Sequence, residues 1–248
     1  MSLIHILETG KDASGADQSA LADKLKRCRV IVVPQANPDG RMRMPYRGWI
    51  GLPQEEMTLR GQGCRKNGEL YRWRGSKAVH PMKGDVGLLG CYFDDAGINM
   101  MHDDWAAPMS AATRALLQLV AEEGPDCVIN LHSHQHMPCL LQTEFVPLSH
   151  RHRVYDFAAK LYDRLDRAGL PHGSLTSSAL RVAASEEHHS FNLQSMFYHV
   201  GAAFCLLFES THGLDDHAEQ FSYSDILNVH LHLFEESVDD LLAASRHS

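Results

Sequence analysis

A short apolar run that ends abruptly in histidines limits the folds that this chain can adopt. Residues 127–131 (Cys-Val-Ile-Asn-Leu) follow a Gly-Pro-Asp turn signal and lead directly into His132. A run of this length after a turn predicts a buried strand. Ligands of open α/β sheets bind just outside the carboxyl ends of the strands. We therefore expect His132 to be a metal ligand or a catalytic base, with His134 on the same face if the strand continues. A solvated histidine-rich loop is the alternative.

The remaining segments alternate between helix and strand patterns. Two apolar runs, 30–33 (Val-Ile-Val-Val) and 202–208, are expected to be strands, and Ser110 is the expected N-cap of a helix. Apolar residues at helical spacing predict helices at 19–26, 110–123, 154–168 and 224–244. This alternation predicts a largely parallel sheet with helices on both faces, in one domain that spans residues 1–248.

Composition restricts the class of protein and its partners. The chain has 248 residues, 44% of them hydrophobic and 22% charged, as is usual for soluble globular proteins. A net charge of -8 argues against nucleic acid or an anionic membrane as partner. The six cysteines form no C-x-x-C pair and suit a reducing cytoplasm. No apolar stretch is as long as a membrane span, and the first ten residues lack a signal-peptide pattern. We expect a cytoplasmic protein whose oligomeric state the sequence does not indicate.

Residues 41–90 have little periodicity and are rich in glycine, proline and arginine. A long irregular segment within a domain is usually a functional loop or a disordered one. The seven arginines between Arg41 and Arg74 make it basic within an acidic chain. Binding of a carboxylate and a solvated surface loop are both open interpretations.

Two further positions carry groups that suit hydrolytic chemistry. Glu209 directly follows an apolar run, so it is either a general base or a hydrated carboxylate at the end of a strand. His5 and Glu8 form an H-x-x-E motif, which brings two side chains within reach of one point. Together with His132 they would supply two imidazoles and one carboxylate, a set found in catalytic zinc sites.

The order of these motifs resembles the zinc carboxypeptidase family, which includes the carboxypeptidase A-like metallopeptidases and the succinylglutamate desuccinylase/aspartoacylase-like branch. The matching segments are H-x-x-E at 5–8, the strand and Asn-Pro-Asp-Gly turn at 33–40, Gly-Ile-Asn-Met at 97–100, Asn-Leu-His-Ser-His at 130–134, and Phe-Glu at 208–209. The resemblance implies a three-layer α/β/α sandwich around a mixed, mainly parallel sheet of about eight strands. It also implies a Zn²⁺ ion held by His5, Glu8 and His132, with Glu209 as general base on the zinc-bound water.

The sequence departs from the family pattern at several positions. Only four residues precede His5, where the family has a strand, which indicates a truncated or mis-set start. Met101 and His102 occupy the places of the family's carboxylate-binding Asn-Arg pair. Arg74 and Tyr198 are the nearest matches to another family arginine and to its substrate-capping tyrosine. The resemblance thus implies substrate binding by Arg74, His102 and Tyr198, whereas His102, Asp103 and Asp104 could instead form a second metal position.

Three functions are consistent with these observations. The first is a zinc-dependent hydrolase that cleaves an amide bond of a peptide or an acyl-amino acid. The second is an N-acyl-amino-acid deacylase of the aspartoacylase or succinylglutamate desuccinylase type, which the missing Asn-Arg pair favours. The third is a non-catalytic relative with a decayed metal site.

Overall fold

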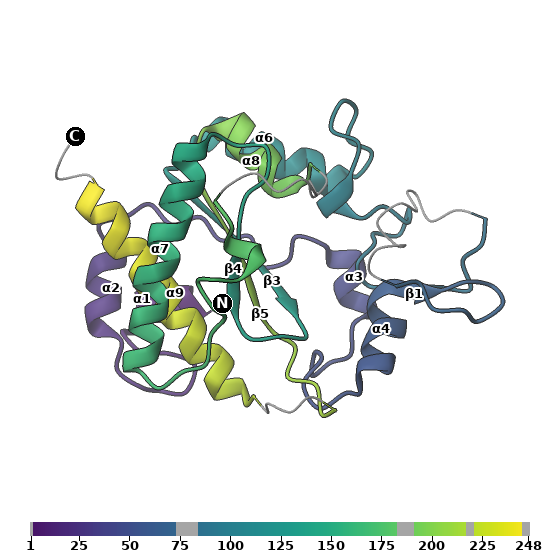
Figure 1. Cartoon of the computed structure of the whole chain (residues 1–248), viewed down its shortest axis with the longest axis horizontal. Helices are drawn as coiled ribbons and strands as arrows, with labels where there is room; N and C mark the ends of the chain where they lie inside the picture. The colour runs from purple at the N-terminus through teal and green to yellow at the C-terminus, as the bar shows by residue number, and fades with distance from the viewer. Residues whose placement is uncertain (1, 73–83, 183–190, 217–220, 245–248) are drawn as a thin grey trace.

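A three-stranded sheet lies at the centre of the fold in the computed structural model, which describes residues 2–72, 84–182, 191–216 and 221–244 (Figure 1). The middle strand is β5 (Phe204–Thr211). It pairs in parallel with β3 (Cys127–His134) and antiparallel with β4 (Cys139–Leu141). A separate antiparallel pair is formed by β1 (Gly63–Cys64) and β2 (Leu88–Leu89).

One face of the central sheet packs against α7 (Leu148–Arg167) and α9 (Tyr223–Ala244). Alternate residues of β5 point to this face because side chains alternate along a strand. Phe204, Leu206 and Phe208 are accordingly buried among side chains of the two helices. From the helices, the core receives Val154, Phe157, Leu161, Leu165, Val229 and Leu233.

The opposite face of the sheet is covered by α6 (Ala111–Glu123) and α8 (Leu193–Gly201). The intervening β5 residue, Cys205, is buried there with Val120 of α6 and Phe197 of α8. Asn192 begins α8 by accepting a hydrogen bond from Ser195 N at 3.1 Å. A short 3-10 helix, η1 (Met100–His102), packs on α8, and a second one, η2 (Ser178–Leu180), lies beside β4.

The N-terminal helices form a further layer outside α9. Ile6 of α1 (Ser2–Thr9) and Leu21 of α2 (Ser19–Leu25) are buried against Leu231 and Val238 of α9. Lys24 links α2 to α9 through Glu235 at 3.0 Å and Asp239 at 2.9 Å. Helix α9 therefore separates α1 and α2 from the central sheet.

The segment that follows α2 leads to α3 (Pro38–Arg43) and α4 (Gln54–Gln62), which lie with β1 on the right of Figure 1. Asn37 caps α3 by accepting a hydrogen bond from Gly40 N at 2.9 Å. Its side-chain amide also donates to Cys91 O at 3.2 Å and to Phe93 O at 3.1 Å. A methyl group on Gly40 would lie 1.9 Å from Cys91 O, so only glycine allows α3 to dock this closely.

The predicted three-layer α/β/α sandwich around about eight strands is wrong for this structure. The described part of the chain contains eight α-helices and only two small sheets, of two and three strands. Two segments account for much of the difference. Residues 30–33 have no regular secondary structure and join no sheet among the described residues, and Ile31 and Val33 are 44% and 45% exposed. Residues 41–90, expected to be irregular, contribute α4 and the β1–β2 pair instead.

Most of the other predicted elements are confirmed. The segments 19–26, 110–123, 154–168 and 224–244 are helical over most of their length. Ser110 occupies the N-cap position of α6, but its side chain makes no capping hydrogen bond. The run at 127–131 is a strand that continues to His134, but its residues are half-buried or, at Leu131, exposed, so the expected burial is wrong. The run at 202–208 is also a strand, but β5 continues to Thr211, so Glu209 lies within it rather than after it. None of the described helices is both long and apolar enough to cross a membrane.

Candidate functional site

His132 and Glu209 lie side by side in the central sheet. They are direct partners in the parallel pairing of β3 with β5, two residues before each strand ends. Neighbouring strands are about 4.8 Å apart, and partners in register point to the same face. The sheet therefore brings an imidazole and a carboxylate, 77 residues apart in sequence, to one place at the carboxyl ends of two parallel strands.

Cys139 extends this pair to a row of three side chains. It is the partner of Glu209 in the antiparallel pairing of β4 with β5, and it is buried. Burial and, to a smaller extent, the charge of Glu209 raise the pKa of the Cys139 thiol to about 12. The thiol is therefore protonated at neutral pH and is not a nucleophile, because the thiolate is the reactive form.

The protonation state of His132 suits a role as ligand or proton acceptor. Burial lowers the pKa of His132 to about 4, since a buried site disfavours the charged imidazolium. At pH 7 the ring is neutral, which is the form that binds a metal or accepts a proton. Tyr92 is also near the pair: burial, followed by the charges of Cys91 and Glu209, raises the pKa of its hydroxyl.

The loops beyond the strand ends are fixed by ring nitrogens and aromatic packing. The Nε2 atom of His134 lies 2.9 Å from Met137 O, and that of His212 lies 2.8 Å from Ser133 O. The ring of Trp49 lies 6.1 Å from that of His212. These contacts tie the segment before α4 to the carboxyl end of β5 and give the site a defined wall.

The structure does not bring His5 and Glu8 to His132. Both residues are exposed on α1, which contacts the rest of the chain through α2 and α9. Within residues 2–72, 84–182, 191–216 and 221–244, no three or more His, Cys, Asp or Glu residues are grouped so as to hold a metal ion. The ligand set that the sequence implied does not fit a zinc ion in this arrangement, and we assign no catalytic step to zinc.

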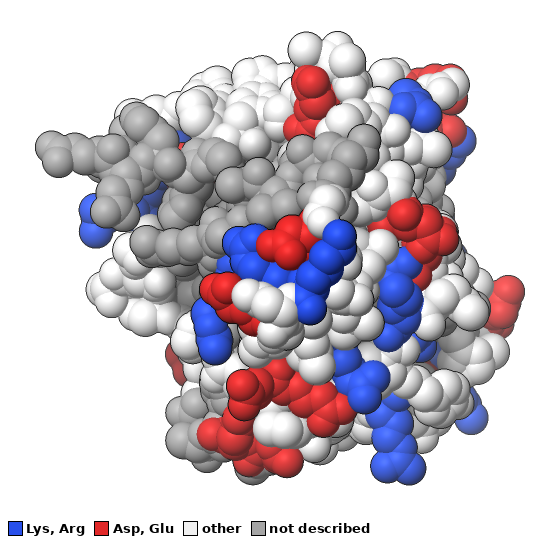
Figure 2. Space-filling view, turned by 90° about the vertical axis from the view of Figure 1, so that its right-hand side faces the viewer, with Lys and Arg blue, Asp and Glu red and all other residues white. Residues whose placement is uncertain are grey.

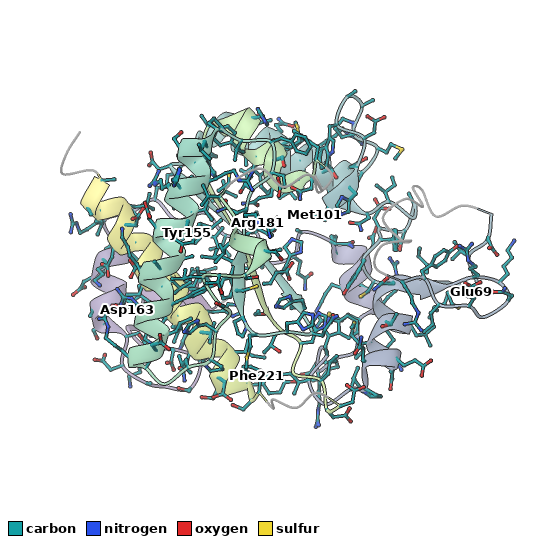
Figure 3. The ribbon with its side chains drawn as sticks, in the orientation of Figure 1. Glu69, Met101, Tyr155, Asp163, Arg181 and Phe221 are labelled. Carbon is teal, nitrogen blue, oxygen red and sulfur yellow. The ribbon has the colours of Figure 1, made fainter. Side chains whose placement is uncertain are left out.

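Residues 102–104 belong to the turn and loop that precede α6. His102 ends η1, and Met101 of the same turn lies against the sheet, with its sulfur 4.0 Å from Asn130 Nδ2 (Figure 3). Asp103 is buried and accepts hydrogen bonds from Met109 N and Ser110 N, both at 3.0 Å. Burial acts to raise the pKa of Asp103, but these bonds and one from Thr113 outweigh it, and the net pKa is lowered. Asp103 thus fixes the loop before α6.

Tyr198 lies at the other end of the sheet from Glu209. Its ring is 4.8 Å from that of His150, which in turn is 5.8 Å from Phe204, the first residue of β5. Glu209 is five residues further along β5, or roughly 16 Å at the usual rise of a strand. The structure therefore does not bring Tyr198 to the His132–Glu209 pair. Arg74 lies outside the described residues.

The basic segment is partly neutralised by carboxylates within it and just after it. Arg60 pairs with Glu56 at 2.8 Å, Arg65 pairs with Asp85 at 2.9 Å, and Arg43 pairs with Asp95. Figure 2, viewed from the side of α3 and α4, shows acidic and basic side chains interspersed on this face. These pairs favour a solvated surface at Arg60 and Arg65, whereas Arg43 is mostly buried and also donates to Phe93 O. Carboxylate binding by the other arginines stays a prediction.

Sequence reasoning missed two neighbours of Glu209. Cys139 reaches Glu209 because β4 turns back antiparallel to β5, and no motif in the sequence marks that return. Tyr92 comes from a segment without periodicity and is brought near by the Asn37 contacts to Cys91 and Phe93. The apolar run before Glu209, in contrast, was a sufficient signal for the strand that carries it.

Comparison with known proteins adds no assignment to this geometry. No protein-family model matches the sequence, and a search of curated proteins found no match. The functional argument therefore depends on the site itself.

Proposed function

We propose that this chain hydrolyses an amide bond in a peptide or an acyl-amino acid, with Glu209 as general base and His132 beside it. One observation carries the proposal: the two residues are register partners at the carboxyl ends of parallel strands. An imidazole that is neutral at pH 7 next to a carboxylate is a suitable pair for proton transfer.

The proposed reaction requires one proton to move twice. Glu209 takes a proton from a water molecule, whose oxygen attacks the amide carbonyl carbon. The carbon–nitrogen bond then breaks, and Glu209 passes the proton to the leaving amine, so that amide and water become acid and amine. The neutral ring of His132 donates a hydrogen bond to the oxygen on which negative charge develops.

Substitution of the pair tests the proposal directly. Glu209→Gln keeps the shape of the side chain but removes the base, and general-base catalysis contributes about 10²–10⁴-fold. We therefore expect Glu209→Gln to lower the hydrolysis rate at least about 100-fold. The assay is release of free amine from a panel of C-terminal peptides and N-acyl amino acids, with unchanged circular dichroism as the control for folding. A variant as active as the parent protein would contradict the proposal.

Zinc is the cofactor that the resemblance implies. The proposed steps do not depend on it, and its binding is tested by measurement. The metal content of protein purified without chelator should be compared for His132→Ala, His5→Ala and Glu8→Ala. From the exposed positions of His5 and Glu8, we expect neither to change the metal content or the activity. Loss of an equimolar metal in all three variants would instead support the ligand set that the sequence implied.

A non-catalytic binding protein is the second proposal. It is supported by the positions of His5 and Glu8, which are exposed on α1 rather than beside His132. Binding of a peptide or an acyl-amino acid without turnover, in the presence and absence of added Zn²⁺, would select this function over hydrolysis.

We also propose a cytoplasmic location without a nucleic-acid partner. The proposal is supported by six cysteines that form no disulfide and by the net charge of -8. Cell fractionation with antibody detection tests the location.

A further inference from the structure

Arg151, near the start of α7, has no carboxylate partner among the residues that the structure describes. The other lysine and arginine residues of this helix each pair with a carboxylate; they are Arg153, Lys160, Arg164 and Arg167. Glu144, the closest carboxylate before α7 in sequence, forms no ion pair with Arg151 either. The helix therefore has a positive charge near its start that no described side chain balances.

Arg151 is also buried, with 8% of its surface exposed. A buried charge is costly unless it is paired and hydrogen-bonded, and arginine stays protonated in proteins. Its Nη2 atom donates to Arg181 O at 2.7 Å. Its Nε atom is shielded from solvent and has no acceptor among the described residues. A single backbone carbonyl therefore compensates this cation only in part.

The guanidinium group of Arg151 reaches the surface through its third nitrogen atom. Nη1 donates to no described residue and, unlike Nε, is not shielded from solvent. Its surroundings are accessible as well. Leu148, one helical turn earlier, is 57% exposed, and Arg181, labelled in Figure 3, is also exposed. An ion from solution can therefore meet Nη1 without a rearrangement of the fold.

The N-terminus of α7 adds positive potential beside Arg151. This helix has 20 residues, Pro147 gives it no side-chain cap, and its first turn contains no acidic residue. Pro147 O accepts hydrogen bonds from His150 N and Arg151 N at 3.0 and 3.2 Å. The N–H groups of Leu148 and Ser149 have no such partner in the described part of the chain. Free N–H groups and the helix dipole both attract anions to a helix N-terminus, so the helix and Arg151 favour the same kind of ligand.

The charges around Arg151 indicate the charge of the ligand. Arg181, whose carbonyl is bonded to Arg151, contributes a second guanidinium group. His150 contributes no charge at pH 7, because burial lowers the pKa of its imidazole. Two arginines and a helix N-terminus together supply roughly 2.5 positive charges. A dianion neutralises this excess better than a singly charged carboxylate does.

We propose that Arg151 and the first N–H groups of α7 bind a phosphate group, either as free phosphate or as part of a phosphate monoester. Arginine side chains and helix N-termini are both frequent partners of phosphate oxygens. Gln142, which donates to Arg151 O at 3.0 Å, lies three residues beyond Cys139. At the usual rise of a strand this is roughly 10 Å from the level of the proposed catalytic pair. The inference therefore does not depend on the proposed hydrolysis.

Calorimetric titration with inorganic phosphate tests the site in the whole chain at neutral pH and constant ionic strength. The parent protein is compared with Arg151→Met and with a matched control, Arg167→Met, which makes the same change at the other end of α7. We expect saturable binding to the parent protein. Arg151→Met removes a charged donor and should weaken binding at least about tenfold, which corresponds to about 1.4 kcal/mol. Arg167→Met should leave it unchanged.

Amide signals of the parent protein provide a second measurement that needs no substitution. In ¹H–¹⁵N spectra we expect phosphate to shift the N–H signals of Leu148 and Ser149 with the same Kd as in calorimetry. This measurement decides the inference even if Arg151→Met fails to fold. O-Phosphoserine distinguishes the two sources of the phosphate group. If it binds as tightly as inorganic phosphate, the site accepts a monoester, and if it binds more weakly, the ligand is free phosphate.

Four outcomes would overturn the inference. The first is the lack of saturable phosphate binding by the parent protein, because ordered water would then be sufficient for Arg151. The second is equal weakening in Arg151→Met and Arg167→Met, because the effect would then reflect net charge alone. The third is shifts of N–H signals elsewhere in the chain but not at the start of α7. The fourth is binding of acetate as tight as that of phosphate, because the site would then not select a dianion.

Discussion

Two histidines are held neutral by their surroundings. His132 lies in the sheet, and His230 lies on α9 with its ring 5.9 Å from that of Phe208. Burial lowers the pKa of each to about 4. Such residues carry no charge in the folded protein at pH values where they would be protonated in the unfolded chain.

The pKa values of these histidines predict acid sensitivity. Between about pH 6.5 and pH 4 the unfolded chain binds more protons than the folded protein, so the free energy of unfolding falls as the pH is lowered. His230→Gln removes one of the groups with a lowered pKa, so we expect a shallower decrease over this range. Urea unfolding at a series of pH values measures the slope. Equal slopes for the variant and the parent protein would show that His230 does not titrate in this way.

At the scale of the element, periodicity identified helices better than strands. The helical segments have apolar residues on one face that pack against a neighbour, so local sequence and tertiary packing agree. Residues 30–33 have a strong strand composition, but pairing depends on a partner edge, which local sequence does not encode. The prediction of a strand at residues 30–33 was therefore wrong, because strand propensity alone does not supply a pairing partner.

Exposure distinguishes this segment from a true core strand. Ile31 is 44% exposed, and Leu206 of β5 is fully buried. We expect Ile31→Thr to change the free energy of unfolding by less than about 0.5 kcal/mol, as is usual for a surface substitution. Leu206→Ala should lower it by about 2–5 kcal/mol, because it leaves a cavity in the core. Guanidinium unfolding measures both, and a loss above about 2 kcal/mol for Ile31→Thr would indicate that the segment is buried in solution.

At the scale of the whole molecule, α9 links separate layers. It packs on β5 and α7 through one set of residues and on α1 and α2 through another. Arg164 of α7 reaches Glu235 at 2.8 Å and Glu236 and Asp239 at 2.9 Å, and Lys24 of α2 joins the same acidic group. These residues lie far apart in sequence, so the network could not be predicted from local patterns.

Loss of the central cation should destabilise this assembly. Arg164→Met keeps much of the side-chain volume but leaves three carboxylates near each other, with Glu236 buried. We expect a decrease of about 1–2 kcal/mol in the free energy of unfolding, between the values of exposed and buried ion pairs. Thermal unfolding at low and high salt measures the effect. A difference between variant and parent protein that does not shrink at high salt would indicate lost packing rather than lost charge.

The position of the candidate site was predictable only in part from the sequence. The apolar runs before His132 and Glu209 indicated strands that end in reactive groups, and parallel pairing brought them together. The H-x-x-E motif was a weak signal, since His5 and Glu8 lie at helical spacing on α1 and point to solvent. A short motif such as H-x-x-E forms a site only when the fold places its side chains next to the other residues of that site.

Glu209 lies inside the middle strand, with β3 bonded on one side and β4 on the other. Its Cα atom therefore cannot shift without breaking backbone hydrogen bonds of β5 to both β3 and β4. The position and direction of this carboxylate are therefore set by the strands rather than by a loop. In the proposed reaction, any adjustment needed to align the scissile bond would have to come from the substrate, which favours substrates with freely rotating backbones over stiff ones.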